Sequence, residues 1–288
     1  MNSSIELSFK AKIKKIAEAN GETPATIWQN LMLERFLVRL SRSNYREHFI
    51  LKGGLLLSKY LPIGRQTQDL VFCAKNLKNE EKILENIFNE IALVQIEDGF
   101  DFRDIAIRPL AHPHMSYLGA QISMIGFFGR TRFKVEIDLG FDDCVKDVIQ
   151  EIPLIQNLKE PLFEKSIQLR CYPREFIFAE KLETIIYRGT KNSRMKDFHD
   201  LYSMISEESW DLHNLEQAVL MVFSHRKTPL NLPLLFQPDE IKMLEVHWTP
   251  YHRGLNLKAI KQPLPASLEE LISHLNNWLG SKTALHSR

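Results

Sequence analysis

The sequence predicts an α/β (α+β) fold in which a small mixed sheet is preceded by helices and followed by a mainly helical C-terminal domain. Apolar residues recur at helical spacing before residue 43, and several strand-like runs lie between turn residues in the segment 49–140. Beyond residue 171 helical spacing dominates again. A chain of 288 residues can bury two cores, and we place the boundary between domains 1–162 and 163–288.

The first two helices are indicated by periodicity and by their end signals. Isoleucine and phenylalanine residues recur among lysines at helical spacing, which predicts a helix over 4–19 that ends at Gly21. Thr23 has the character of an N-cap, and Pro24 suits the first position of a second helix. That second apolar pattern ends in the polar run Ser41–Asn44.

A glycine pair follows, between a strand and a helix. The segment 48–61 predicts a short buried strand, a tight turn at Gly53 and Gly54, and a short helix. Such a turn lets the backbone approach a ligand closely, and the amides at the helix start favour a phosphate. A purely structural turn is the commoner meaning of an isolated Gly-Gly pair, so the phosphate interpretation depends on the segments that follow.

Two strands carry acidic residues. Residues 66–73 have the apolar content of a strand whose alternation puts Asp69, Val71 and Cys73 on one face. A carboxylate in a buried strand is costly unless it is paired or bound to a metal ion.

The second acidic strand covers 132–140, where the apolar residues face one way and Glu136 and Asp138 face the other. Carboxylates that converge from two strands suit Mg²⁺, which can carry a nucleoside triphosphate by its phosphates. The alternative is a solvated acidic strand edge with no ligand.

The remaining elements follow from the same two periodicities. Further strands are predicted at 102–109, 116–126 and 166–171. Helices are predicted at 79–93, 175–189, 196–206, 214–225, 238–247 and 267–280.

Charged residues gather in two neighbouring C-terminal helices. Lys181 shares one side of the helix over 175–189 with Thr184 and Arg188, where its ammonium can meet a triphosphate. Alternatively these are solvated salt bridges, and the charges at the next helix start are caps and surface ions: Arg194, Lys196, Asp197 and Asp200.

Composition excludes several classes. The net charge of +1 gives no overall attraction to nucleic acid, so nucleotide or RNA must meet a local basic groove, which we expect from Arg65, Lys181, Arg188, Arg194 and Lys196. The three cysteines form no CxxC pair, and neither a signal-peptide core nor a membrane-length apolar run is present, so we expect a reduced cytoplasmic protein without a membrane partner.

Other catalytic patterns are missing or weak. The sequence lacks Gly-x-Ser-x-Gly, Walker and HExxH motifs, which argues against serine hydrolases, P-loop NTPases and zincins. His112 and His114 flank a proline with no third ligand nearby, so we assign them no role. Cys73 in an apolar strand is expected to be an inert thiol.

Taken in order, these segments resemble the AbiEii/AbiGii nucleotidyltransferase toxins, a branch of the polymerase-β-like nucleotidyltransferases found in bacteria. The resemblance covers about residues 15–205 and rests on Leu33–Ser41, Phe49–Gly54, Arg65-x-Thr67-x-Asp69, Ile137–Phe141, Ala179–Glu183 and Asn192–Leu201.

The resemblance implies roles for these residues. Gly53 and Gly54 would hold phosphate, Asp69 and Asp138 would bind metal and act in catalysis, and Lys181 would contact the triphosphate as a further catalytic group. Nucleotide binding would extend to Arg65, Thr67, Arg194, Lys196 and Asp197.

The family's activity is implied in the same way. Its members transfer a nucleotide from a nucleoside triphosphate to an acceptor, tRNA in some of them, and act as toxins of type IV toxin–antitoxin, or abortive infection, systems. The resemblance therefore implies Mg²⁺ as cofactor, and a nucleoside triphosphate, an RNA acceptor and a cognate antitoxin as partners.

The chain departs from the family pattern at Val71. The pattern asks for Asp-x-Asp, because two metal ions balance the triphosphate charge and activate the acceptor hydroxyl. Val71 cannot ligate a metal, so we expect weak metal binding and a large loss of rate. Glu136 and Cys73 are the nearest residues to compensate, and the glutamate is the better ligand.

Two other functions remain open at this stage. A catalytically silent protein of the same fold would bind nucleotide or antitoxin without transfer. A two-metal nuclease would also use clustered carboxylates, although it gives no reason for the glycine turn or Lys181.

Overall fold

The computed structural model describes residues 3–110, 119–141, 146–157, 160–206, 209–255 and 263–285. The chain forms two compact units. The first unit comprises Met1–Lys59, Gln66–Asp143 and Asp147–Cys171, and the second comprises Tyr60–Arg65, Cys144–Lys146 and Tyr172–Arg288. The boundary at residue 162 stays a prediction; the strand Ser166–Cys171 belongs to the first unit.

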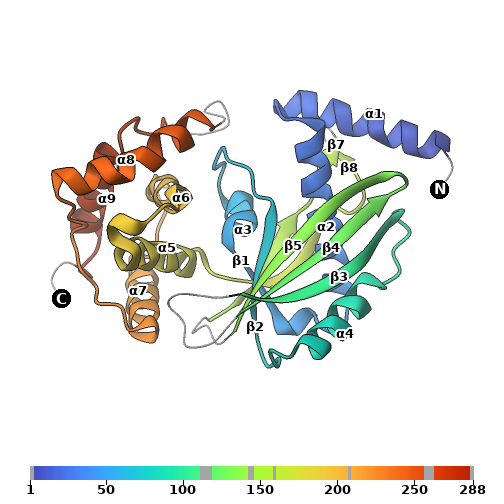
Figure 1. The fold of residues 1–288 in the computed structure, drawn as a ribbon, viewed down its shortest axis with the longest axis horizontal. Helices are drawn as coiled ribbons and strands as arrows, with labels where there is room; N and C mark the ends of the chain where they lie inside the picture. Colours follow the sequence, from blue (N-terminus) through green and yellow to red (C-terminus); the bar gives the residue numbers. More distant parts are fainter. Residues whose placement is uncertain are drawn as a thin grey trace. The chain divides into compact units, whose positions relative to one another are not determined.

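Two helices open the first unit as the sequence predicts. Helix α1 spans Ser3–Asn20, and α2 spans Pro24–Arg42. The Thr23 hydroxyl caps α2 by accepting a hydrogen bond from the Thr26 amide at 3.2 Å. Most of α2 is buried, and it lies against the sheet (Figure 1).

A seven-stranded mixed sheet forms the centre of the first unit. Its strands, in the order in which they pair, are β3 (Phe100–Leu110), β4 (Gly119–Phe128), β5 (Thr131–Phe141), β2 (Asp69–Ala74), β1 (Phe49–Lys52), β9 (Ser166–Cys171) and β6 (Val148–Pro153). The pairs β2–β5 and β1–β9 are parallel, and the other pairs are antiparallel. The sheet therefore confirms the mixed α/β class.

Three strands were not expected from the sequence. Strand β6 has only Ile152 buried, so it lacks the alternation that marks a half-buried strand. Strands β7 (Gln156–Asn157) and β8 (Glu160–Pro161) form a separate two-residue pair, too short for any periodicity.

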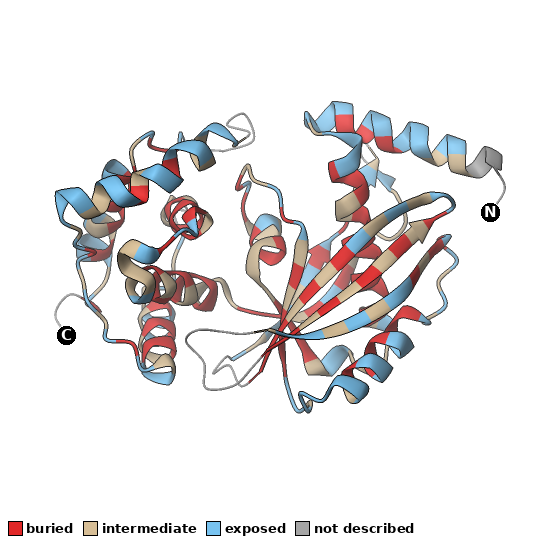
Figure 2. Cartoon of the chain, in the orientation of Figure 1, coloured by how far each residue is buried: buried red, intermediate tan, exposed pale blue. Residues whose placement is uncertain are grey.

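The two faces of β3, β4 and β5 differ in burial (Figure 2). One face carries the buried residues Val135 and Ile137, and a side chain at Gly126 on that face would meet Met32 of α2. The opposite face carries Glu136 and Asp138, which are only half-buried.

Three short helical segments complete the first unit: η1 (Arg46–His48), α3 (Gly53–Tyr60) and α4 (Glu81–Ala92). Helix α4 is amphipathic and packs on β3 with its apolar side, as the spacing over 79–93 predicts (Figure 1).

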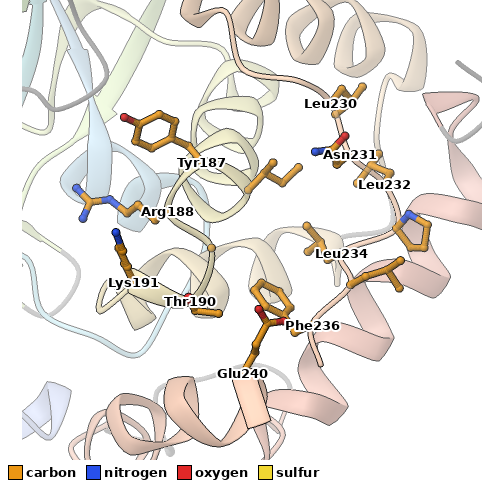
Figure 3. Close-up of a pocket in the computed structure, with 14 residues that line it drawn as sticks. Tyr187, Arg188, Thr190, Lys191, Leu230, Asn231, Leu232, Leu234, Phe236 and Glu240 are labelled. Atoms are coloured by element: carbon orange, nitrogen blue, oxygen red, sulfur yellow. The ribbon is translucent and has the colours of Figure 1, made fainter. Parts of the chain in front are cut away.

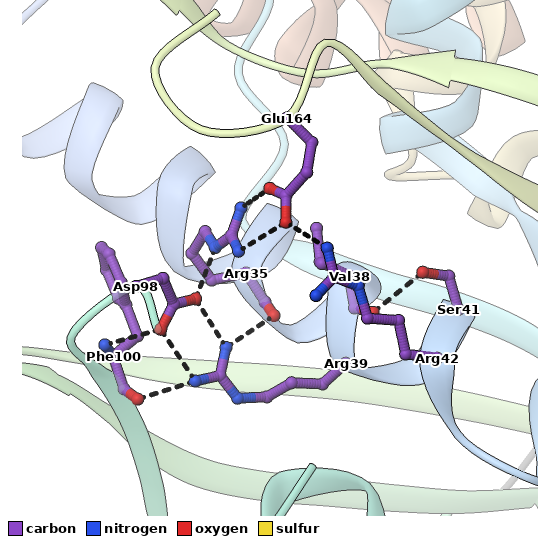
Figure 4. A network of polar contacts seen from close by, with 8 residues as sticks. All are labelled: Arg35, Val38, Arg39, Ser41, Arg42, Asp98, Phe100 and Glu164. Carbon is purple, nitrogen blue, oxygen red and sulfur yellow. Dashed lines mark hydrogen bonds and ion pairs between the residues drawn. The ribbon is translucent and has the colours of Figure 1, made fainter. Parts of the chain in front are cut away.

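A network of arginine and carboxylate side chains fixes α2 within the first unit (Figure 4). Asp98 accepts hydrogen bonds from Arg35 Nε at 2.7 Å and from both terminal nitrogens of Arg39 at 2.9 and 3.0 Å. Glu164 pairs with Arg35 and, at 2.6 Å, with Arg42. Burial alone would raise the pKa of Asp98, but the arginines hold it below its ordinary value.

The second unit is helical. Its elements are α5 (Arg174–Arg188), η2 (Gly189–Lys191), α6 (Met195–Ile205), α7 (Leu212–Arg226), α8 (Pro238–Arg253) and α9 (Leu268–Lys282). Helix α5 packs on α6 and α7, and α6 packs on α8 and α9. Helix α8 passes its predicted end at 247 because Trp248 is fully buried and anchors the last turns, despite Pro250.

No helix in the described part of the chain is long and apolar enough to cross a membrane.

Candidate functional site

The glycine turn sits against the acidic strand. Strand β1 ends at Lys52, and Gly53 opens α3 with a φ of +78°. A Cβ atom at Gly53 would lie 3.0 Å from the Cβ and Cγ2 atoms of Val71. Glycine is therefore required at residue 53 by its backbone conformation and by the space that Val71 takes.

The register of β2 and β5 positions the acidic residues. Asp69 is paired with Glu136, and Val71 is paired with Asp138. The carboxylate that the family pattern asks for at residue 71 would thus stand directly opposite Asp138 and beside the Gly53 backbone. Val71 puts methyl groups there instead.

Cys73 and Glu136, the two residues considered as substitutes for that carboxylate, differ in their strand partners and contacts. Cys73 is paired with Gly140 and is only 3% exposed, and its thiol contacts the carbonyl oxygen of Ala74. Glu136 lies opposite Asp69 and forms an ion pair with Lys134 at 2.5 Å.

Two glutamines that sequence reasoning missed hold this arrangement. Gln121 of β4 is paired with Asp138, and its Nε2 donates to Asp138 Oδ1 at 3.1 Å. Gln29 of α2 donates its amide to the carbonyl oxygens of Gln68 at 3.2 Å and Lys134 at 3.0 Å. Gln29 therefore ties the start of β2 to β5. A lone glutamine on a helix carries no sequence signal for such a contact.

These residues do not complete a two-metal site. Asp69 and Asp138 offer the oxygen ligands that Mg²⁺ prefers. Within the described ranges, however, no group of three or more histidine, cysteine, aspartate or glutamate side chains is placed to hold a metal ion. Val71, the residue that faces Asp138, offers no ligand atom.

Five of the charged residues named in the sequence analysis meet within the second unit. Lys181 of α5 lies 2.9 Å from Asp197 and 2.7 Å from Asp200. Arg65 binds Asp200 with two nitrogens, Nε at 2.7 Å and Nη2 at 2.6 Å. Arg194 Nε lies 2.8 Å from Asp197. We call Lys181, Asp197, Asp200 and Arg65 the buried ion cluster, and the exposed Arg194 borders it.

The electrostatics of this cluster are those of tightly paired charges. Burial alone would lower the pKa of Lys181, but Asp197 and Asp200 raise it above its ordinary value. Burial likewise acts to raise the pKa of Asp197 and of Asp200, yet Lys181 and the neighbouring arginines lower both. The cluster is therefore fully ionised at neutral pH.

A histidine beside the cluster was not predicted to matter. His199 is fully buried, and its Nδ1 lies 2.8 Å from the hydroxyl of Tyr251. Burial lowers the pKa of His199 to about 4. Burial also raises the pKa of Tyr251, so this pair stays neutral.

The other predicted residues lie as follows. Gly54 is the second residue of α3, Thr67 is buried just ahead of β2, and Lys196 is half-buried in the first turn of α6. His112 and His114 fall outside the described residues.

The second unit also contains a pocket of about 630 Å³ (Figure 3). Leucines and Phe236 of the loop 230–236 form one wall. The end of α5 and η2 form another wall, which carries Arg188 and Lys191.

Known proteins resemble this chain in sequence and in fold. A family model described as the nucleotidyl transferase AbiEii toxin of type IV toxin–antitoxin systems matches residues 35–272. The search of curated proteins gave no match.

Two solved structures share the fold. MenT4, a nucleotidyltransferase toxin from Mycobacterium tuberculosis H37Rv, has 16% identity and a TM-score of 0.62, covering 97% of this chain and 92% of its own. JHP933 from Helicobacter pylori has 15% identity and a TM-score of 0.50, covering 92% of this chain and 93% of its own. The family model spans most of the sequence, and the chain belongs to the AbiEii nucleotidyltransferase toxin family.

Proposed function

We propose that this protein transfers a nucleotide from a nucleoside triphosphate to an RNA acceptor such as tRNA, with Mg²⁺, and thereby acts as a toxin under the control of a cognate antitoxin. The observation that carries the proposal is the β2–β5 register, which pairs Asp69 with Glu136 and residue 71 with Asp138 beside the Gly53 turn. The chain's membership of a nucleotidyltransferase toxin family supports this proposal. A glycine turn at a helix start is suited to binding the phosphates of a nucleoside triphosphate.

The residues take separate roles in this proposal. The amides at the start of α3 bind phosphate oxygens, for which Gly53 leaves the backbone accessible. Asp69 and Asp138 are the metal-binding carboxylates, and Gln121 orients Asp138. Lys181 and Arg194 are the cations proposed to bind the triphosphate. To do so, the triphosphate must replace Asp197 and Asp200 as their ion-pair partners.

The rate of this chain is proposed to be low. A site with a carboxylate at residue 71 would place two negative charges on facing strand positions, and Val71 removes one of them. Metal binding then loses a ligand, and the charge of the triphosphate is less well balanced.

The test is the Val71→Asp variant, with Val71→Asn as its matched control. Both replacements are close to valine in size, so both fit beside Gly53, but only aspartate adds a charged ligand. Purified proteins are incubated with labelled nucleoside triphosphates, total RNA and either Mg²⁺ or a chelator. We expect Val71→Asp to label RNA at least about a hundredfold faster than Val71→Asn, since losing a key electrostatic group costs roughly 10²–10³ in rate.

The outcomes separate the possible functions. Labelling of RNA by neither variant counts against nucleotide transfer. Shortening of the RNA instead of labelling would favour a nuclease.

A second candidate is a catalytically silent protein that binds nucleotide or antitoxin. Val71 favours it, because the methyl groups stand where a ligand is needed. If the unchanged protein binds nucleoside triphosphate in calorimetry but labels no RNA, while Val71→Asp does, this chain is silent and its lineage is catalytic.

A further inference from the structure

A band of three basic and two apolar side chains, one of them aromatic, lies on the half-open face of β3, β4 and β5. We call it the open sheet face and define it by Arg103 of β3, Ile125 and Phe127 of β4, and Arg132 and Lys134 of β5. The strand registers make these residues neighbours, because Phe127 is paired with Arg132, and Ile125 is paired with both Lys134 and Arg103. Odd-numbered residues of β4 point away from α2, since Gly126 points toward Met32 of that helix.

The side chains of this face are accessible. Arg103, Arg132 and Lys134 are exposed, and Ile125 and Phe127 are half-buried. Among the helices that the structure describes in the first unit, none is drawn across this face of β3, β4 and β5 (Figure 1). An aromatic ring and a branched apolar side chain are thus left facing outward between cations.

The cations are held loosely or not at all. Arg103 pairs with Asp101 and stands over the Phe127 ring at 5.4 Å, and Lys134 pairs with Glu136. Exposed ion pairs of this kind contribute little to stability. Arg132 makes no hydrogen bond or ion pair through its side chain within the described part of the chain.

This face is continuous with the acidic site. Alternate residues of β5 share one side, so Arg132, Lys134, Glu136 and Asp138 form a single row. At about 3.4 Å per strand residue, the row from Arg132 to Asp138 is roughly 20 Å long. A nucleic-acid strand stacked at about 3.4 Å per nucleotide would cover it with about six nucleotides.

We propose that the open sheet face binds single-stranded RNA, with phosphates on Arg103, Arg132 and Lys134 and a base stacked on Phe127. The strand runs along β5 and brings its acceptor end to Asp138. This inference rests on the proposed transfer to RNA and adds the surface that selects the acceptor. Charge complementarity favours RNA over an apolar peptide, because three cations surround one ring in a chain whose net charge is only +1.

Binding is measured by fluorescence anisotropy of a labelled twelve-nucleotide single-stranded RNA with the full chain, in the absence of nucleotide and Mg²⁺. The Arg132→Ala, Lys134→Ala double variant is expected to lower the slope of log affinity against log salt by about 1.4, because each phosphate contact on a single strand contributes about 0.7. Phe127→Ala is expected to weaken binding at least about fivefold, and Phe127→Tyr to retain it, because stacking needs only the aromatic ring.

The matched control is Lys78→Ala, Lys82→Ala, which removes two exposed cations near the start of α4 in the same unit. This control variant should show the same slope of log affinity against log salt as the unchanged protein. An equal loss in the control, or unchanged binding in Phe127→Ala and in the double variant, would overturn the proposal. Equal affinity for a duplex of the same sequence would overturn the stacking arrangement.

The same variants distinguish this proposal from the proposed function. If RNA binds this face but is never labelled, even by the Val71→Asp protein, the proposed RNA-binding surface is supported and the proposed nucleotide transfer is contradicted. If all variants bind RNA with the same affinity and label it at the same rate, the proposed nucleotide transfer is supported and the proposed RNA-binding surface is contradicted.

Discussion

Asp69, on the sheet of the first unit, and the two aspartates of the second unit's buried ion cluster have opposite surroundings. Asp197 and Asp200 are at most 1% exposed, and each contacts two cations. Asp69 is half-buried, and its side chain has no hydrogen bond or ion pair with the residues that the structure describes. Buried charges must be paired for the chain to fold, whereas a half-open carboxylate without a partner is available to a ligand.

The largest effect on stability is expected when the buried ion cluster loses a carboxylate. Asp200→Ala would remove the carboxylate that both Arg65 and Lys181 contact, and breaking such a buried cluster costs about 3–5 kcal/mol. Urea unfolding combined with hydrogen exchange of α5 and α6 measures this loss. Asp239→Ala is the control, because that aspartate is exposed and its pair with Lys242 contributes little. Equal losses in both variants would contradict the distinction between buried and open charges.

His199 predicts a pH dependence within the second unit. Its folded pKa of about 4 lies below its ordinary value of 6.5, because burial disfavours the charged ring. The unfolded chain therefore binds the extra proton first, and stability is lost as the pH falls from about 6.5 to about 4. The loss amounts to about 3 kcal/mol over that window.

His199→Gln should flatten the dependence of the unfolding free energy on pH between 6.5 and 4. The glutamine also changes the contact with Tyr251, so the slope and not the absolute stability is the readout. His213→Gln, at an exposed position of α7, serves as the control. A slope that is the same in both variants would show that His199 is not held neutral.

The same comparison explains what sequence could predict. The helix periods, the Thr23 cap and the apolar alternation of β5 are local, so the mixed α/β class and most elements followed from them. The family pattern likewise directed attention to Asp69 and Val71. The pairing of Val71 with Asp138 is a strand register, and a register joins segments far apart in the chain.

The partners of the charged residues were beyond the sequence for a related reason. Arg65 precedes the acidic strand in the chain, yet it binds Asp200 of α6 within the second unit. Gln29 and Gln121 have no distinguishing neighbours in sequence and act only through contacts made on folding. Residue type indicates what a side chain can do, but tertiary packing decides which charges are already paired.

A smaller loss of stability is expected at the glycine turn of the first unit. Gly53→Ala would place a Cβ atom 3.0 Å from Val71 and force a φ of +78° on alanine, which costs about 1–3 kcal/mol. Adding Val71→Ala should remove the contact with Cγ2, but it should leave the contact with the Cβ atom of residue 71 and the backbone strain. Gly54→Ala is the control and should be neutral or stabilising, because that residue lies within α3. Thermal unfolding compares the variants, and equal effects at Gly53 and Gly54 would refute the strain at the turn.

The smallest effect on stability is expected at the acidic face itself. Asp69→Asn removes a charge that no described side chain neutralises and that stands opposite Glu136, so the unfolding free energy should change by less than about 0.5 kcal/mol. In the Val71→Asp background the same substitution should abolish labelling of RNA, because it removes a proposed metal ligand. A loss of several kcal/mol would mean that Asp69 is paired within the fold as Asp200 is. A carboxylate that is available to a ligand should contribute little to the unfolding free energy and much to the rate of transfer. A carboxylate that is paired in the core should show a large loss of unfolding free energy when it is removed.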